Sequence, residues 1–168
     1  MVGNSADPVN NHLEILNFLE RYKDQNLKIL CPLSYGKQDY AENVIKNGRA
    51  RFGDKFIPLT EFISSERYLQ ILGTIDVMIL NHGRQQGLGS IISALNLQKK
   101  VYIRANTTPF RFFKDKGVFI YDTLKLQSED FRTLFEFSED IGKSNSVIIR
   151  NEFSEESSVA LWKKVLED

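Results

Sequence analysis

Residues 81–90, with the sequence NHGRQQGLGS, have the residue types of a phosphate-binding turn. They lie between two apolar runs, residues 76–80 and 91–95, which predict a buried strand and the first turns of a helix. The free backbone N–H groups at a helix start, with the helix dipole behind them, attract anions. Arg84 adds a guanidinium that pairs bidentately with phosphate oxygens. This loop is the first candidate for the working end of the protein.

Other polar segments follow apolar runs in the same way. In an open parallel sheet, ligands gather outside the carboxyl ends of the strands, so these segments are expected to meet at one edge. They are rich in amides, hydroxyls and glycines, which suits a ligand with phosphates and many hydroxyls, and they comprise residues 3–7, 32–36, 81–89 and 104–108. The Gly87-x-Gly89 pair is a weak signal by itself, because a tight strand-to-helix turn explains it equally well and the third glycine of a dinucleotide fingerprint is absent.

Each charged candidate also has a structural interpretation. Arg84 is either a ligand contact, which its flanking glycines and glutamines favour, or a solvated surface residue. Arg104 ends a buried strand and needs a partner, either a phosphate or a carboxylate such as Asp122. His82 is either a ligand or acid–base group or an exposed loop residue without a role, and His12 has the position of a helix cap.

The sequence points to no metal site and names no catalytic residue. His12 and His82 are the only histidines, and no paired carboxylates have the spacing expected of acid–base catalysis. Cys31 lies in the apolar stretch 27–33 and predicts a buried free thiol in a reducing compartment, not a nucleophile. Residues 110–114, FRFFK, either touch a membrane surface or a lipid-bearing substrate or pack their phenylalanines in the core, and core packing is favoured.

The elements that position these residues alternate along the chain. Apolar runs predict strands, stretches of helical spacing predict helices, and their alternation predicts an α/β fold with a doubly wound, mainly parallel sheet. The predicted strands are residues 27–33, 56–59, 76–81, 100–104 and 118–121, and the predicted helices are 11–22, 40–52, 64–72 and 87–97. Ser64 and residues 128–130 have the residue types of helix N-caps.

The two ends of the chain depart from the regular alternation of strands and helices. Residues 2–8 resemble the end of a strand and its loop, which indicates a piece of a longer protein. After about residue 140 the pattern predicts a loop, then a short strand or connector, then a terminal helix carrying Trp162, over residues 142–145, 147–149 and 153–166 respectively.

Length and composition set broader limits. The 168 residues are enough for one domain with a sizeable core. Lys plus Arg and Asp plus Glu both number 22, so no overall positive field attracts nucleic acid. No signal peptide and no apolar run of membrane-spanning length is visible, so we expect a soluble cytoplasmic domain.

Three segments resemble a known family. The first is residues 3–8, GNSADP, followed by Asn10-Asn11-His12. It is similar to the loop after the first strand of the second domain in bacterial Fuc4NAc transferases, the 4-acetamido-4,6-dideoxy-galactose transferases of enterobacterial common antigen assembly in glycosyltransferase family 56. Residues 84–89 match the family signature Arg-Gln-Gln-Gly-x-Gly. Residues 104–106 with 109–110 resemble a further family segment, with Thr107-Thr108 inserted here. The resemblance spans residues 2–125.

The resemblance implies a GT-B glycosyltransferase, of which residues 1–168 form the C-terminal, Rossmann-like, donor-binding domain without the N-terminal acceptor domain. The family transfers Fuc4NAc from a thymidine diphosphate (TDP) sugar to a polyprenyl-linked saccharide, by peripheral association with the cytoplasmic face of the inner membrane, and GT-B enzymes need no metal or other cofactor. Together with the residue chemistry, it places the donor diphosphate against Gly3, Asn4, Ser5, Arg84, Gln85, Gln86, Gly87, Leu88, Gly89 and Ser90, with His12, His82, Arg104 and Asn106 as secondary contacts.

Two alternatives stand beside this interpretation. A non-catalytic nucleotide- or phosphate-binding module would keep the phosphate loop and need no partner domain. A structural α/β interaction domain would need no small ligand, although the glycines, glutamines and arginines of the strand-end loops count against it. Further α/β sequence upstream would favour the transferase over the first alternative.

Overall fold

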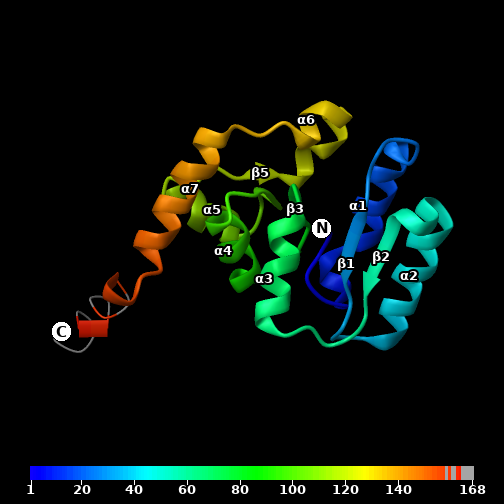
Figure 1. The fold of residues 1–168 in the computed structure, drawn as a ribbon, viewed down its shortest axis with the longest axis horizontal. Coiled ribbons are helices and arrows are strands. Elements are labelled where there is room, and N and C mark those ends of the chain that lie inside the picture. Colours follow the sequence, from blue (N-terminus) through cyan, green and yellow to red (C-terminus); the bar gives the residue numbers. More distant parts are fainter. Residues whose placement is uncertain (158, 160–161, 164–168) are drawn as a thin grey trace.

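The computed structural model describes residues 1–157, 159 and 162–163, and in them strands and helices alternate as the sequence predicts (Figure 1). The strands are β1 Ile29–Pro32, β2 Phe56–Leu59, β3 Val77–Leu80, β4 Lys100–Ile103 and β5 Tyr121–Asp122. The helices are α1 His12–Leu19, α2 Gln38–Phe52, α3 Ser65–Thr74, α4 Leu88–Asn96, α5 Thr108–Asp115, α6 Phe131–Phe135 and α7 Glu139–Glu152.

The strands form two small parallel sheets, β1–β2 and β3–β4–β5, which the first residues of the chain join. Val2 N–H donates to Leu30 O at 2.9 Å, and Gly3 N–H donates to Ile79 O at 3.0 Å. Residues 1–3 therefore lie between β1 and β3. From there the chain builds outward through β1 and β2, and then in the opposite direction through β3, β4 and β5. The order reverses between residues 1–3 and β3, which is where ligands bind in Rossmann-like folds.

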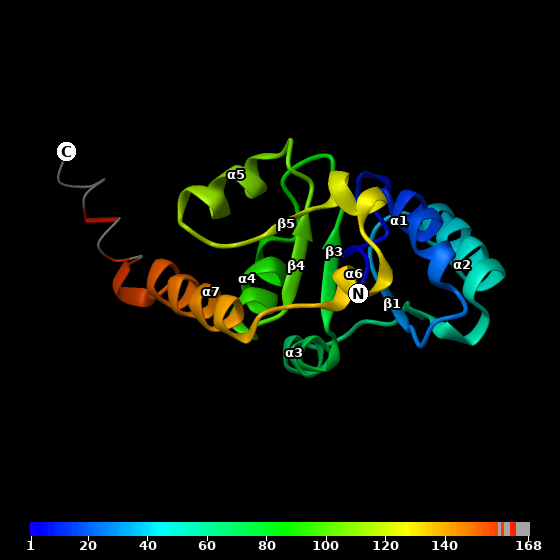
Figure 2. The same ribbon diagram turned by 90° about the horizontal axis from the view of Figure 1, so that it is seen from above.

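Successive residues of β3 face two different cores. Val77 and Ile79 pack in a core with residues of α1 and α2, whereas Met78 and Leu80 pack in a core with residues of α3 and α4. Side chains of a strand alternate between the faces of its sheet, so helices cover both faces. Figures 1 and 2 show β1 and β2 with α1 and α2 at one end of the molecule, and β4 with α4, α5 and α7 at the other. The predicted doubly wound α/β fold is confirmed.

Two predictions for the region beyond residue 140 are wrong, the loop over 142–145 and the short strand or connector over 147–149. Residues 142–145 and 147–149 both lie within α7. The buried residues of this helix, Gly142, Asn145, Ser146 and Ile149, recur at helical spacing, but three of them are small or polar and hide the pattern. A Cβ on Gly142 would lie 3.1 Å from Gln98 Cβ, so the glycine lets α7 approach the segment after α4 closely. Of the predicted terminal helix over 153–166, residues 155–157, 159 and 162–163 are helical, and the rest lies outside the described residues.

Several smaller predictions are confirmed. Ser64 caps α3, because its side chain accepts from Arg67 N–H, and Asp130 caps α6 by accepting from Thr133 N–H. Cys31 is completely buried, and burial raises the pKa of its thiol to about 12, which removes it as a nucleophile. Core packing of the FRFFK segment is confirmed only in part, because Phe113 is completely buried and Phe110 partly buried, whereas Phe112 is 37% exposed. Among the described residues, no helix is long and apolar enough to cross a membrane.

Candidate functional site

The loops that follow residues 1–3, β1 and β3 meet at the carboxyl edge of the sheet, and backbone hydrogen bonds join them. Ala6 N–H donates to Tyr35 O at 2.7 Å, and Lys37 N–H donates back to Ala6 O at 2.9 Å. Gly83 N–H donates to Val9 O at 3.0 Å. The predicted convergence of these segments is therefore seen in the structure, and we call this edge the rim.

Gly3 leaves the sheet in a conformation that favours glycine, with φ +68°. A Cβ at this position would lie 2.2 Å from His12 Nε2, so the histidine ring fills the space beside the backbone. His12 is completely buried, and its Nδ1 lies 3.3 Å from the Tyr40 hydroxyl. The interpretation of His12 as a helix cap is wrong: Asn11 occupies the cap position, and the His12 ring packs beneath the rim.

Asn10, which the sequence identified only as part of the family segment, connects the first rim loop with the loop after β3. Its buried Oδ1 accepts from Asn4 N–H at 3.0 Å, and its Nδ2 donates to Asp7 O at 3.1 Å. The same Oδ1 lies 2.8 Å from His82 Nε2. Because backbone groups hold both ends of the Asn10 amide, its orientation is fixed. Asparagine is a common turn residue, and the bond of Asn10 to Asp7 is local in the sequence. Its contact with His82, 72 positions away, is made only in the folded structure.

His82 is buried, so its interpretation as an exposed loop residue is wrong. Its side chain lies between two oxygens, Asn10 Oδ1 and, at 3.1 Å, Gln86 O. Burial lowers the pKa of His82 to about 4, with the Gln86 carbonyl opposing the shift, so the ring is neutral at neutral pH. In this state only one of its two nitrogens carries a proton to donate, and the contact with Asn10 places residues 82–86 against the first loop.

The loop before α4 holds its residues in different surroundings. Arg84 is exposed, and its guanidinium donates to Asp7 Oδ2 at 2.7 Å. Hydrogen bonds from Val9 N–H and from Arg84 keep the pKa of Asp7 below its ordinary value. Gln86 turns inward, and its Nε2 donates to Ser5 Oγ at 2.7 Å. Gln85 is exposed.

Helix α4 begins at the sheet edge without a side-chain cap. Gly87 precedes it with φ +67°, and a Cβ there would lie 3.1 Å from Asn4 Cγ, so Asn4 packs directly against the helix start. The first bond of this helix runs from Ile91 N–H to Gly87 O, which leaves the N–H groups of the preceding residues unused within it. Those N–H groups belong to Leu88, Gly89 and Ser90.

Three buried polar atoms of the rim lack a hydrogen-bond partner: Asn4 Oδ1, His12 Nε2 and Gln86 Oε1. Buried polar groups of a folded protein are nearly always paired, so unpaired ones call for an explanation. All three belong to residues that contact Gly3, Ser5 or Gly87, at the point where strand order reverses. Their clustering marks this edge as the part of the described structure where hydrogen-bonding capacity is left over.

Arg104 lies beside this cluster but is held by the protein. Its guanidinium donates to Glu14 Oε2 at 3.2 Å and to Asn81 Oδ1 at 3.1 Å. The carboxylate partner is therefore Glu14 and not Asp122, whose Oδ1 instead accepts from Ala105 N–H at 3.1 Å. Asn106 is exposed beyond the end of β4. In the described part of the chain, no hydrogen bond joins it to the loop before α4.

Two tyrosines that the sequence did not identify complete the rim. The Tyr35 hydroxyl accepts from Asn4 Nδ2 at 3.2 Å, and the Tyr68 hydroxyl donates to Ser90 Oγ at 3.0 Å. Burial raises the pKa of Tyr68, and the nearby Tyr35 phenol adds to the shift. The only available signal for Tyr35 was its place in the loop after a predicted strand.

Two further features bear on where the chemistry of the protein lies, metal-binding groups and the cavities. Within the described ranges, no group of three or more His, Cys, Asp or Glu residues is arranged to hold a metal ion. A cavity of about 530 Å3 lies at the amino ends of the strands, lined by Met1, residues 26–30 and residues 74–77 among others. It contains none of the polar residues described above, so we assign the chemistry to the rim.

Comparison with known protein families yields a match over nearly the whole chain. Residues 1–162 match the family described as 4-alpha-L-fucosyltransferase glycosyl transferase group 56. The matched range contains every rim residue described above.

Proposed function

Because the chain belongs to glycosyltransferase group 56, a family of fucosyltransferases, we propose that its rim binds the diphosphate of a nucleotide-sugar donor. A glycosyltransferase of this family requires such a donor and an acceptor. The finer proposal is that the donor is a TDP-sugar carrying Fuc4NAc or a related deoxy-amino sugar. The acceptor in this proposal is a polyprenyl-linked saccharide, and the product a surface polysaccharide such as enterobacterial common antigen.

The uncapped start of α4 is the observation that carries this proposal. Its unused N–H groups lie at the switch point of the sheet, and the loop that leads into the helix carries an exposed guanidinium, that of Arg84. Backbone N–H groups at a helix start bind phosphate without any specialised side chain. The neighbouring unpaired amide oxygens, Asn4 Oδ1 and Gln86 Oε1, would accept from hydroxyl groups of a sugar or ribose after small rearrangements.

The chemistry that this arrangement supports is electrostatic. When the bond between the sugar C1 and the phosphate oxygen breaks, the electron pair stays on the departing diphosphate. The N–H groups of Leu88, Gly89 and Ser90 and the Arg84 guanidinium would stabilise that charge. Preorganised donors of this kind typically contribute about 3 kcal/mol each to the transition state. No residue of the rim is proposed as the catalytic base.

Donor binding as proposed would change the partner of Arg84. Asp7 occupies the guanidinium in the structure, at 2.7 Å, and its carboxylate would repel a diphosphate placed beside it. Both side chains are partly or largely solvent-exposed, so the pair is readily exchanged. In the proposal, the diphosphate replaces the carboxylate as the partner of Arg84.

The domain organisation is part of the same proposal. The resemblance to two-domain GT-B enzymes supports residues 1–168 as one nucleotide-sugar-binding domain, with the acceptor and the cytoplasmic membrane face engaged through a second, N-terminal domain. By this proposal the chain alone binds donor and transfers no sugar. A non-catalytic nucleotide-binding module is the alternative, and turnover by the chain joined to its upstream sequence would exclude it.

A parallel calorimetric titration with TDP, uridine diphosphate and inorganic phosphate tests the proposed function. Tighter binding of TDP than of the other two supports a TDP-sugar donor site. Equal binding of all three would reduce the site to a phosphate site, and absence of binding to all three would contradict the proposal. Sugar transfer by the purified chain would contradict the proposed domain organisation.

A further inference from the structure

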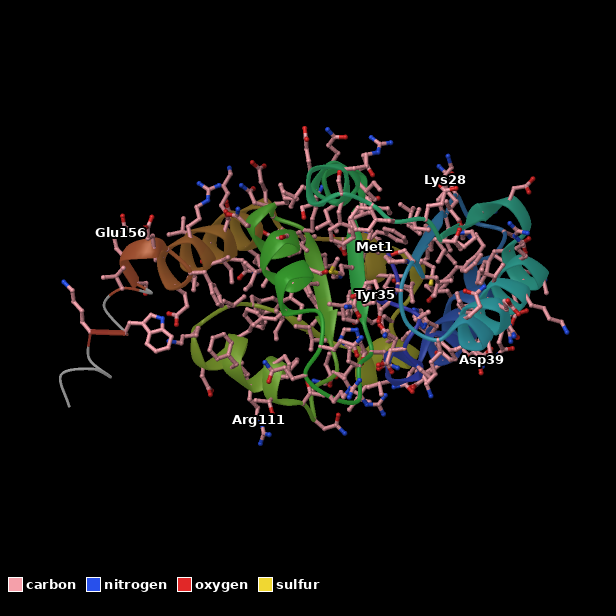
Figure 3. The ribbon with its side chains drawn as sticks, turned by 90° about the horizontal axis from the view of Figure 1, so that it is seen from below. Met1, Lys28, Tyr35, Asp39, Arg111 and Glu156 are labelled. Carbon is pink, nitrogen blue, oxygen red and sulfur yellow. The ribbon has the colours of Figure 1, made fainter. Side chains whose placement is uncertain are left out.

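Tyr35 is an aromatic residue that the protein holds in place but leaves uncovered. Its side chain is 60% exposed, although its hydroxyl accepts from Asn4 Nδ2 at 3.2 Å. Its backbone carbonyl accepts from Ala6 N–H at 2.7 Å. The next residue, Gly36, has φ +117°, and a Cβ there would lie 2.6 Å from the Ala6 carbonyl, so the loop has little freedom. Figure 3 labels Tyr35 near the middle of the molecule in that view.

The residues that hold Tyr35 also contact the start of α4. Asn4, which donates to the Tyr35 hydroxyl, packs against Gly87 at the helix start. Tyr68, whose pKa the Tyr35 phenol helps to raise, donates to Ser90 in the first turn of α4. The ring therefore lies beside the proposed diphosphate site.

An open groove lies near this loop. It has a volume of about 660 Å3 and is lined by residues 58–64, Arg67 and Ile71, between the carboxyl end of β2 and the start of α3. Leu33 N–H donates to Leu59 O at 2.8 Å, which brings the loop that carries Tyr35 next to the loop that forms the groove. Arg67 of the groove is adjacent in sequence to Tyr68.

We propose that Tyr35 is the stacking surface for the nucleobase of the donor, whose diphosphate lies at the start of α4 and whose base extends toward the groove beyond β2. The inference rests on the proposed function and adds the residue that distinguishes a nucleotide from a bare diphosphate. Stacking needs a flat face that is open to solvent and already held in position, because an ordered platform avoids the entropy cost of fixing a free side chain. Tyr35 meets both conditions, since its hydroxyl and its backbone are bonded while its ring is exposed.

The test compares three variants in titrations with TDP, with a TDP-sugar and with inorganic pyrophosphate. Tyr35→Ala removes the ring, and Tyr35→Phe keeps the ring without the hydroxyl. Phe119→Ala removes an aromatic ring of similar exposure, 52%, that packs on Tyr121 away from the rim. Circular dichroism melts of all variants establish that each is folded.

Tyr35→Ala is expected to weaken TDP binding at least about fivefold, the lower end of the contribution of base–aromatic stacking, and to leave pyrophosphate binding unchanged. Tyr35→Phe should retain most of the TDP affinity, and Phe119→Ala all of it. Unchanged TDP binding by Tyr35→Ala would overturn the stacking proposal while leaving the donor site intact. An effect on a TDP-sugar but none on TDP would show stacking of the sugar and also overturn it. Failure of the unmodified chain to bind either ligand would instead refute the donor site itself.

Discussion

Replacing Arg84 by alanine is expected to weaken TDP binding about tenfold. A hydrogen bond to a charged group contributes about 1.5–3 kcal/mol, which corresponds to a factor of about 10 to 150 in Kd. The structure favours the lower end of this range. Arg84 is 64% exposed and must first give up its bond to Asp7, so part of the gain from the diphosphate is offset by the lost ion pair.

The matched variant, Asp7→Asn, tests the same reasoning from the other side. It removes the carboxylate that competes with the diphosphate and leaves an amide of the same size, whose oxygen can still accept from Val9 N–H. TDP binding should therefore become a few-fold tighter. In the double variant only part of the gain from Asp7→Asn should remain, because no guanidinium is left to be released while the repulsion of the diphosphate is still removed.

Isothermal titration calorimetry at low and at moderate salt measures both effects. The affinity lost in Arg84→Ala should be smaller at higher salt, because an exposed charge pair is screened. Thermal melts should change little, since the Arg84–Asp7 pair is at the surface. Equal TDP affinity of Arg84→Ala and the unmodified chain would remove Arg84 from the site. Weaker binding by Asp7→Asn would refute the competition between Asp7 and the diphosphate.

Three further predictions concern the support of the rim. Gly3→Ala should lower the free energy of unfolding, measured in urea, by about 2–5 kcal/mol, because φ is +68° and the new Cβ would lie 2.2 Å from His12 Nε2. Gly89→Ala is the control and should leave the free energy of unfolding nearly unchanged, because the space around Gly89 is open. Asn81→Ala should cost about 1–3 kcal/mol, since Arg104 and the Thr123 hydroxyl, 2.7 Å from Asn81 Oδ1, both lose their acceptor; an unchanged unfolding midpoint would count against this hydrogen-bond network. Burial lowers the pKa values of His12 and His82 from 6.5 to about 4, so between these pH values the unfolded state binds more protons than the folded state. The contribution of the two neutral rings to the free energy of unfolding should therefore be fully present above pH 6.5 and decrease as the pH falls toward 4. Histidine NMR resonances that titrate near pH 6.5 in the folded protein would contradict this prediction.

The strands and most helices were predictable because their signals are local. Residues 56–59 were predicted as a strand and form β2 with the same bounds, and the cap at Ser64 was identified from residue type alone. The alternation of these elements then led to the parallel, doubly wound architecture, because few connections between such elements are sterically favoured. The family resemblance drew on short loop segments, residues 3–8 and 84–89 among them, and the family match is confirmed.

The partners of the rim residues were decided by the tertiary structure. Arg104 is bound by Glu14, 90 positions away, and not by the nearby Asp122, while His82 meets Asn10 across the reversal of strand order. Helix α7 was not predicted because its buried face consists largely of small and polar residues, which do not form an apolar stripe. These residues are buried because they pack and form hydrogen bonds against α4. Backbone preference and periodicity depend on neighbours in sequence and can be read there. The pairing of side chains depends on which loops the crossovers bring to the same edge, and that is determined only when the whole sheet is assembled.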